Sequence, residues 1–165
     1  MRNVFALPLV LCGVLLAGCG GESEDSDAEP VECEAPTLPN VAYPQETEFV
    51  DAPPAGTGGP LTDGDYELVA FIRYRSPGEC LSDQVARAAV RLKNRGTVMS
   101  YIFDSSAPGE PESPKGFAGR VKANGNVLQV ATVCPEMKTI SLGYTASGDF
   151  LSLFEGEEEL RFERR

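Results

Sequence analysis

Residues 117–133 decide the fold and read Phe-Ala-Gly-Arg-Val-Lys-Ala-Asn-Gly-Asn-Val-Leu-Gln-Val-Ala-Thr-Val. The pair Asn124-Gly125 is a strong signal for a type I′ turn, because both central residues of that turn have positive φ. We expect short strands at 117–123 and 127–133, on either side of this turn. The stretch therefore predicts a β-hairpin.

Other segments between Leu61 and the C-terminus have the same strand-and-turn pattern. One expected strand has a face formed by Tyr66, Leu68, Ala70, Ile72 and Tyr74. Further strands are expected at 86–93, 97–104, 138–145, 150–154 and 158–163, with turns at Asn94-Arg95-Gly96, Ser147-Gly148 and Gly156. Residues 83–94 are the one stretch that also suits a helix, because Asp83 is a good helix cap and alanine and arginine favour helices.

Eight sequential strands joined by mostly short turns predict an all-β protein. We expect an eight-stranded antiparallel up-and-down barrel, since closure hides the two edge strands of a meander. The alternative is an immunoglobulin-like β-sandwich with a cysteine pair between its sheets. That fold favours a buried tryptophan, and the chain has none.

The N-terminus resembles the signal peptide and lipobox of bacterial lipoproteins. A basic start is followed by a short apolar run that ends in Leu16-Ala17-Gly18-Cys19. The resemblance implies a signal peptide at 1–18 that is removed, and acylation of Cys19, palmitate included. Gly20 and Gly21 then imply the outer membrane by the family's sorting rule. The alternative is an ordinary signal peptide and a soluble secreted protein.

Residues 19–60 are expected to be a disordered linker before a domain at 61–165. They hold ten acidic residues, seven prolines and no lysine or arginine, so they have little apolar surface to offset the entropy cost of ordering. The alternative is that residues 41–50 dock on the domain.

Three cysteines remain after Cys12 leaves with the signal peptide and Cys19 is acylated. We predict a Cys80–Cys134 disulfide, because both residues follow strands that end at the same rim of a meander. It would draw the loop after the first strand over the opening. The pairing of Cys33 is left open, and the alternative is reduced or differently paired thiols.

The domain also resembles lipocalin-like barrels. Gly64-Asp65-Tyr66 is similar to the Gly-x-Trp motif at the start of that family's first strand, and the resemblance implies that Arg161 or Arg164 stacks on the aromatic ring. It also implies an interior that binds a small hydrophobic ligand. Candidate lining residues are Tyr66, Tyr74, Tyr101, Phe103 and Tyr144.

Composition limits the classes of function. The chain has no histidine, so the usual general base and the commonest metal ligand are missing. We therefore expect that the protein is not an enzyme and that it has no cofactor and no metal site. The acidic balance of -11 argues against nucleic acid as a partner. We expect a monomeric envelope lipoprotein that binds a hydrophobic ligand. The alternative is a structural or inhibitor-like module with a filled core and an interaction patch around Val69 and Phe71.

Overall fold

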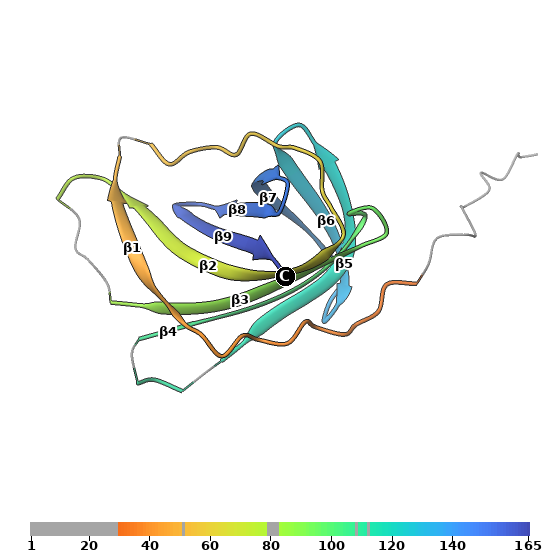
Figure 1. Ribbon diagram of the computed structural model, residues 1–165, viewed down its shortest axis with the longest axis horizontal. Helices are drawn as coiled ribbons and strands as arrows, with labels where there is room; N and C mark the ends of the chain where they lie inside the picture. Colours follow the sequence, from red (N-terminus) through yellow and green to blue (C-terminus); the bar gives the residue numbers. More distant parts are fainter. Residues whose placement is uncertain (1–29, 51, 79–82, 108, 112) are drawn as a thin grey trace, which may run out of the picture.

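The computed structural model describes residues 30–50, 52–78, 83–107, 109–111 and 113–165, and every regular element in these ranges is a strand (Figure 1). The nine strands are β1 (Tyr43–Phe49), β2 (Gly64–Arg75), β3 (Val85–Lys93), β4 (Val98–Ser106), β5 (Lys115–Asn124), β6 (Val127–Cys134), β7 (Lys138–Ser147), β8 (Phe150–Glu155) and β9 (Glu158–Arg164). The predicted signal peptide, Cys19 and Cys80 lie outside the described residues.

The strands form one mixed sheet that closes into a ring. From β2 to β9, each strand pairs antiparallel with the next, and β9 pairs back onto β2, with Leu68 opposite Phe162. The all-β prediction is confirmed, and residues 83–94 contain a strand rather than a helix. Sequential strands are neighbours in a single sheet, which is not the two-sheet Greek-key arrangement of an immunoglobulin sandwich.

Strand β1 shows that the predicted disordered linker is wrong for residues 43–49, where the alternative of docking on the domain is confirmed. Residues 19–29 of that linker lie outside the described residues. Strand β1 runs parallel to the second half of β2, with Gln45 opposite Phe71, and it pairs with β3 where Tyr43 lies opposite Ala86. The first half of β2 pairs with β3 only over Gly64–Glu67. Strand β1 therefore fills the wedge where β2 and β3 separate, and its parallel pairing makes the sheet mixed.

The hairpin at 117–133 forms as predicted, but its turn differs. Asn124 pairs with Val127, so the two loop residues are Gly125 and Asn126. Gly125 has a φ of 61°, whereas Asn126 is not among the described non-glycine residues with positive φ. Positive φ at the first loop residue alone is typical of a type II′ turn, not type I′.

A β-bulge in β2 changes which side chains face the interior. The register with β9 shifts between Leu68 and Ala70, so one extra residue enters the strand. Phe71 then belongs to the interior core, opposite Leu160, while Ile72 pairs with Glu159 on the outer side. The single face predicted from Tyr66 to Tyr74 is therefore wrong beyond Leu68.

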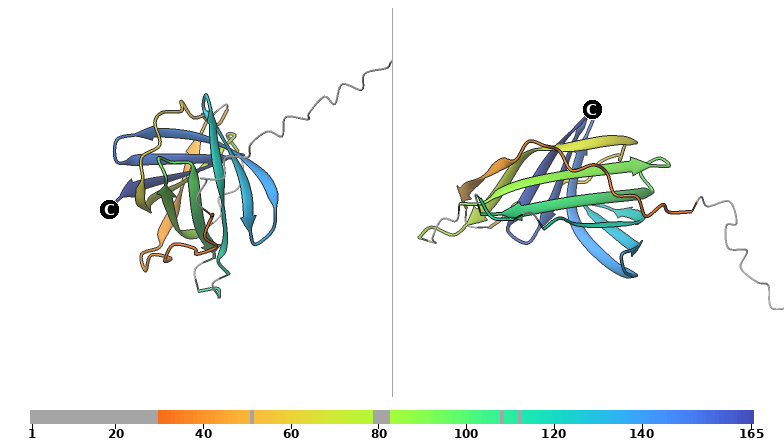
Figure 2. Two further views of the ribbon diagram at one scale, coloured as in Figure 1. Left: turned by 90° about the vertical axis from the view of Figure 1, so that its right-hand side faces the viewer. Right: turned by 90° about the horizontal axis from the view of Figure 1, so that it is seen from below.

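The segment before β1 crosses the outside of the ring, and we call residues 30–42 the strap. Figure 2 shows it in orange, running over β3 and β4. Beneath it lie small buried side chains of the outer face, among them Ser100 and Ala118. Pro36 and Pro39 of the strap are buried as well, so this segment is packed against the domain.

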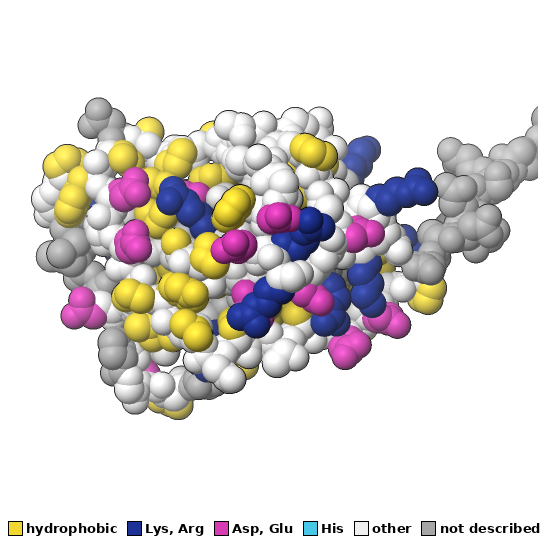
Figure 3. Space-filling view, in the orientation of Figure 1, with side chains coloured by type: hydrophobic (Ala, Val, Ile, Leu, Met, Phe, Trp, Pro, Cys, Tyr) yellow, Lys and Arg dark blue, Asp and Glu magenta, His cyan; other side chains and the backbone are white. Residues whose placement is uncertain are grey.

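Charges are mixed on the face seen in Figure 3. Lysine and arginine side chains lie beside aspartate and glutamate across that face. Ion pairs of the domain include Arg164 with Asp149 and Arg91 with Asp65. This face therefore carries no continuous stripe of one sign.

Candidate ligand-binding cavity

The interior of the ring holds a cavity of about 580 Å³ at one end. Pro114, Pro135 and Glu155 line it, and they lie at the connections β4–β5, β6–β7 and β8–β9. In an antiparallel sheet these alternate connections share one end of the strands, which we call the open end. The opposite end carries the turns at Asn94–Gly96, Gly125 and Gly148.

Aromatic rings form one wall of the cavity. Tyr101 stacks with Phe103 at a centroid distance of 6.3 Å and meets Phe117 at 5.0 Å. Phe103 also makes an edge-to-face contact with Phe71 at 6.3 Å. The rings are held together because Tyr101 and Phe117 are opposite each other in the β4–β5 ladder. Such pairs add stability beyond their buried area.

Aliphatic side chains form the other wall. Leu142 of β7, Leu153 of β8 and Leu160 of β9 line the cavity, with Ile140 nearer the mouth. Leu153 and Leu160 are directly paired, so their side chains lie on the same face of the sheet. An apolar ligand body would contact leucine on one side and aromatic rings on the other.

Charged groups surround the mouth. Glu158 is paired with Arg73 across the β2–β9 ladder, and Lys138 binds Glu136 at 2.9 Å. Glu155 and Lys115 also line the cavity and make no ion pair among the described residues. The site thus has an apolar body and a mouth with one cation and one carboxylate available to a ligand.

Tyr101 is the polar group inside the apolar part. Burial raises the pKa of its hydroxyl, and the carboxylates of Glu155 and Glu158 raise it further. The group therefore stays protonated, and it makes no hydrogen bond within the described residues. Its hydroxyl is available to hydrogen-bond a polar atom of a bound molecule.

Two of the predicted lining residues belong to the packed core at the opposite end. Tyr144 donates a hydrogen bond to the Gly59 carbonyl at 2.9 Å, and Tyr66 donates to the Thr62 carbonyl at 2.8 Å. Residues 52–63 cross that end, where Gly58 forms a bridge with Thr145. This crossing fills the ring, so the end is closed.

Tyr74 lies away from the cavity, on the outer side of the sheet. Its hydroxyl donates to the carboxylate of Glu159, which is only 3% exposed. Burial and this contact raise the pKa of Tyr74 to about 12. Burial also acts to raise the pKa of Glu159, but hydrogen bonds from Arg161, Tyr74 and Ser152 outweigh it, and that pKa lies below its usual value.

The disulfide differs from the predicted one. Cys134 is bonded to Cys33, with a Cα–Cα distance of 5.7 Å, so it is not available to Cys80. The β5–β6 ladder explains the geometry: a register shift after Ala118 places Cys134 opposite Ala118, beneath the strap. With three cysteines, sequence alone leaves three pairings open.

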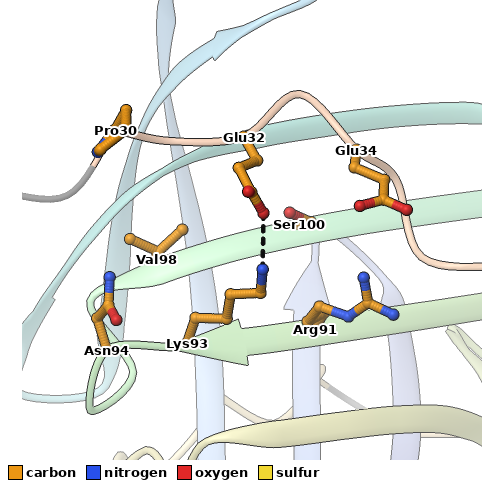
Figure 4. A pocket seen from close by; sticks show the side chains of 8 residues that line it. All are labelled: Pro30, Glu32, Glu34, Arg91, Lys93, Asn94, Val98 and Ser100. Carbon is orange, nitrogen blue, oxygen red and sulfur yellow. Dashed lines mark hydrogen bonds and ion pairs between the residues drawn. The ribbon is translucent and has the colours of Figure 1, made fainter.

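Charge contacts hold the strap beside the disulfide. Figure 4 shows Glu32 reaching from the strap to Lys93, with 2.8 Å between the carboxylate and the ammonium group. Glu34 lies above Arg91 in the same view. Acidic residues that suggested a solvated linker therefore face the basic side chains of β3.

Sequence reasoning missed the aliphatic wall and Phe117. Tyr101 and Phe103 do line the cavity, whereas Tyr66, Tyr74 and Tyr144 do not. A useful signal was available: strand pairing across short turns places Phe117 opposite Tyr101. The resemblance had pointed to Arg164 or Arg161 beside Tyr66; Arg164 lies opposite Tyr66 in the ladder and binds Asp149 at 2.8 Å.

Comparison with protein-family models, with curated proteins and with solved structures found no match to this chain. No helix long and apolar enough to cross a membrane occurs among the described residues. The same part of the chain contains no cluster of three or more histidine, cysteine, aspartate or glutamate side chains that could hold a metal ion.

Proposed function

We propose that this protein is a lipid-anchored lipoprotein of the bacterial cell envelope that binds one small, mainly apolar molecule inside a lipocalin-like barrel. The cavity of about 580 Å³ is the observation that carries the proposal. Its volume falls in the range of small-molecule sites, which are mostly apolar with a few placed polar groups. Closure of β2–β9 supports the barrel, since eight strands enclose room for one small ligand.

The lining suggests an amphiphilic ligand. An apolar body would lie between Phe117 and the leucines, with a polar atom near the Tyr101 hydroxyl. A charged or polar head would reach Lys115 and Glu155 at the mouth. This is a binding role rather than a catalytic one, because the lining offers recognition groups and the chain has no histidine to serve as a base.

The alternative function was a structural or inhibitor-like module with a filled core and an interaction patch around Val69 and Phe71. The structure does not support that patch. Phe71, one of the two residues proposed for that patch, is 1% exposed and packs in the core.

The cavity is tested with an apolar fluorescent probe and two tryptophan variants of neighbouring residues. Ile140→Trp adds volume inside the cavity, whereas Ser141→Trp places the same ring on the exposed outer face. We expect Ile140→Trp to weaken probe binding at least about tenfold, since overpacking excludes the ligand. Unchanged binding by this variant, or no binding by the wild-type chain, would overturn the proposal.

Anchoring is proposed from Leu16-Ala17-Gly18-Cys19, and the outer membrane from Gly20 and Gly21. Growth with a palmitate analogue should label the wild-type protein and not the Cys19→Ser variant. Equal labelling of both, or label in neither, would end this part of the proposal. Native mass spectrometry of the unanchored variant from its own host would identify a bound molecule.

A further inference from the structure

The wall of the ring has a lateral gap near the open end. Lys115, Gly116 and Phe117 at the start of β5 pair with β4. The pairing of β5 with β6, however, starts only at Ala118 and Cys134. Between the first three residues of β5 and the β6–β7 connection, the described residues thus show no ladder.

The residues beside this gap line both the cavity and a hollow on the outer surface. Gly116, Phe117 and Pro135 line the interior cavity, and the same three residues line an outer hollow of about 450 Å³. Val133 and Ala35 border this hollow on the outside. The cavity and the outer hollow therefore adjoin at these three residues.

Exposed apolar side chains flank the gap. Met137 is 86% exposed and Val133 is 42% exposed, although both are large hydrophobic residues. Lys138, which is ion-paired with Glu136, follows directly, and Lys115 lines the cavity mouth. Exposed apolar tips with a nearby cation, here Lys115, suit the boundary between acyl chains and phosphate head groups.

The disulfide keeps this surface near the membrane anchor. Cys33 is bonded to Cys134, which is the neighbour of Val133 and Pro135. Only the chain from Cys19 to Cys33 separates the bond from the proposed acylation site, and it spans at most about 50 Å when fully extended. The packed strap, with Pro36 and Pro39 buried, holds the following chain against the same side of the domain.

We propose that the face around the gap, formed by Gly116, Phe117, Val133, Pro135 and Met137, rests on the lipid bilayer, and that ligand passes sideways between bilayer and cavity. We call it the portal face. The proposal rests on the function proposed above. A short tether holds the domain at a high effective concentration near the bilayer, so a small apolar contact suffices.

Single tryptophan reporters test the contact, because the chain has no tryptophan. Met137→Trp reports on the portal face, and Phe150→Trp is the matched control, since Phe150 is 58% exposed at the other end of the ring. The chain from residue 19 onward, with Cys19→Ser, is held on phosphatidylcholine vesicles by a preceding histidine tag and a nickel-chelating lipid. The protein has no histidine of its own to compete.

We expect Met137→Trp emission to shift to shorter wavelength and to be quenched several-fold more strongly by brominated acyl chains than Phe150→Trp emission. Equal quenching, or stronger quenching of the control, would overturn the proposal. So would a shift of Met137→Trp that occurs without vesicles as protein concentration rises, because the face would then bind a second copy. Near-ultraviolet circular dichroism checks that both variants fold.

Transfer of a fluorescent fatty acid separates the portal from the cavity. The double variant Val133→Ser, Met137→Ser should take the probe from vesicles roughly tenfold more slowly, while its affinity in vesicle-free buffer stays unchanged. Unchanged transfer overturns the portal. Absence of binding in buffer by the wild-type chain overturns the cavity function instead, and the tryptophan reporters still decide whether the face touches lipid.

Discussion

The two ends of the ring are built differently. At the closed end, residues 52–63 cross the ring and accept hydrogen bonds from Tyr144 and Tyr66. At the open end, Tyr101 occupies a comparable aromatic position but has no hydrogen-bond partner among the described residues, and a cavity lies beside it. The contrast shows how one sheet encloses a filled core at one end and leaves room for a ligand at the other.

The largest expected effect compares two phenylalanines. Phe162 is fully buried in the core, so Phe162→Ala should cost about 3–5 kcal/mol of unfolding free energy. Phe117→Ala should cost less than half as much, because Phe117 borders a void and loses fewer contacts. Urea denaturation measures both. Similar losses would show that the open end is as tightly packed as the closed end.

Removal of the disulfide is next in size. Cys33→Ser should lower the unfolding free energy by about 2–5 kcal/mol, because the bond closes a long loop. Hydrogen exchange should increase in the strap, while amides near Tyr144 remain protected. Cys80→Ser is the control and should leave the bond intact. Peptide mapping without reductant that recovers Cys80 linked to Cys134 would refute the assigned pairing.

Hydroxyl deletions sharpen the comparison further. Tyr144→Phe removes a hydrogen bond to the Gly59 carbonyl and should cost about 1 kcal/mol. Tyr101→Phe should leave stability almost unchanged and weaken binding of probes that carry a polar head. Thermal unfolding measures the stability of both variants, and probe titration measures their affinity for ligands. A loss of stability in Tyr101→Phe equal to that in Tyr144→Phe would contradict this division.

The smallest expected effect concerns two adjacent glutamates on opposite sides of the sheet. Although burial acts to raise it, the pKa of Glu159 lies below the ordinary value of a glutamate because Arg161, Tyr74 and Ser152 donate hydrogen bonds to its carboxylate. Its ionised form therefore stabilises the fold fully above that ordinary value. This contribution is lost as the pH falls through the lower, folded-state pKa. Glu159→Gln should therefore make the free energy of unfolding less dependent on pH in the acid range. Urea midpoints measured as a function of pH test this expectation.

Glu158→Gln provides the contrast, since Glu158 lines the cavity mouth. It should change the preference among charged probes. If Glu158→Gln bound charged probes with the same preference as the wild-type chain, the distinction between the outer and inner glutamates would fail.

Much of the fold follows from local signals in the sequence. Turn residues such as Asn124-Gly125 and Ser147-Gly148 separate strands whose alternation reflects one buried face, so eight strands and their order could be predicted. Strand β1 was anticipated only by the alternative that residues 41–50 dock on the domain, because its neighbours are proline-rich and acidic, as in disordered segments. Its pairing depends on the wedge between β2 and β3, which no local pattern reveals.

The site was predicted less well, for two physical reasons. Alternation assigns a strand's faces only if its register is continuous, and the bulge after Leu68 moved Tyr74 to the outer side. Cysteine pairing depends on which segments cross, and the strap brings Cys33 to Cys134. Tyr101 and Phe103 were placed correctly because β4 is regular along its length.

The pairing of β2 with β9 also sets a condition on how the protein matures. Under the proposed export, the polypeptide emerges with its N-terminus first, so β2 leaves the cytoplasm long before its last partner. The native ring therefore cannot form until translation and translocation are complete. The chain stays unfolded enough to be exported, but the unpaired edge of β2 is exposed to aggregation in the meantime. Envelope chaperones would have to protect that edge during the interval.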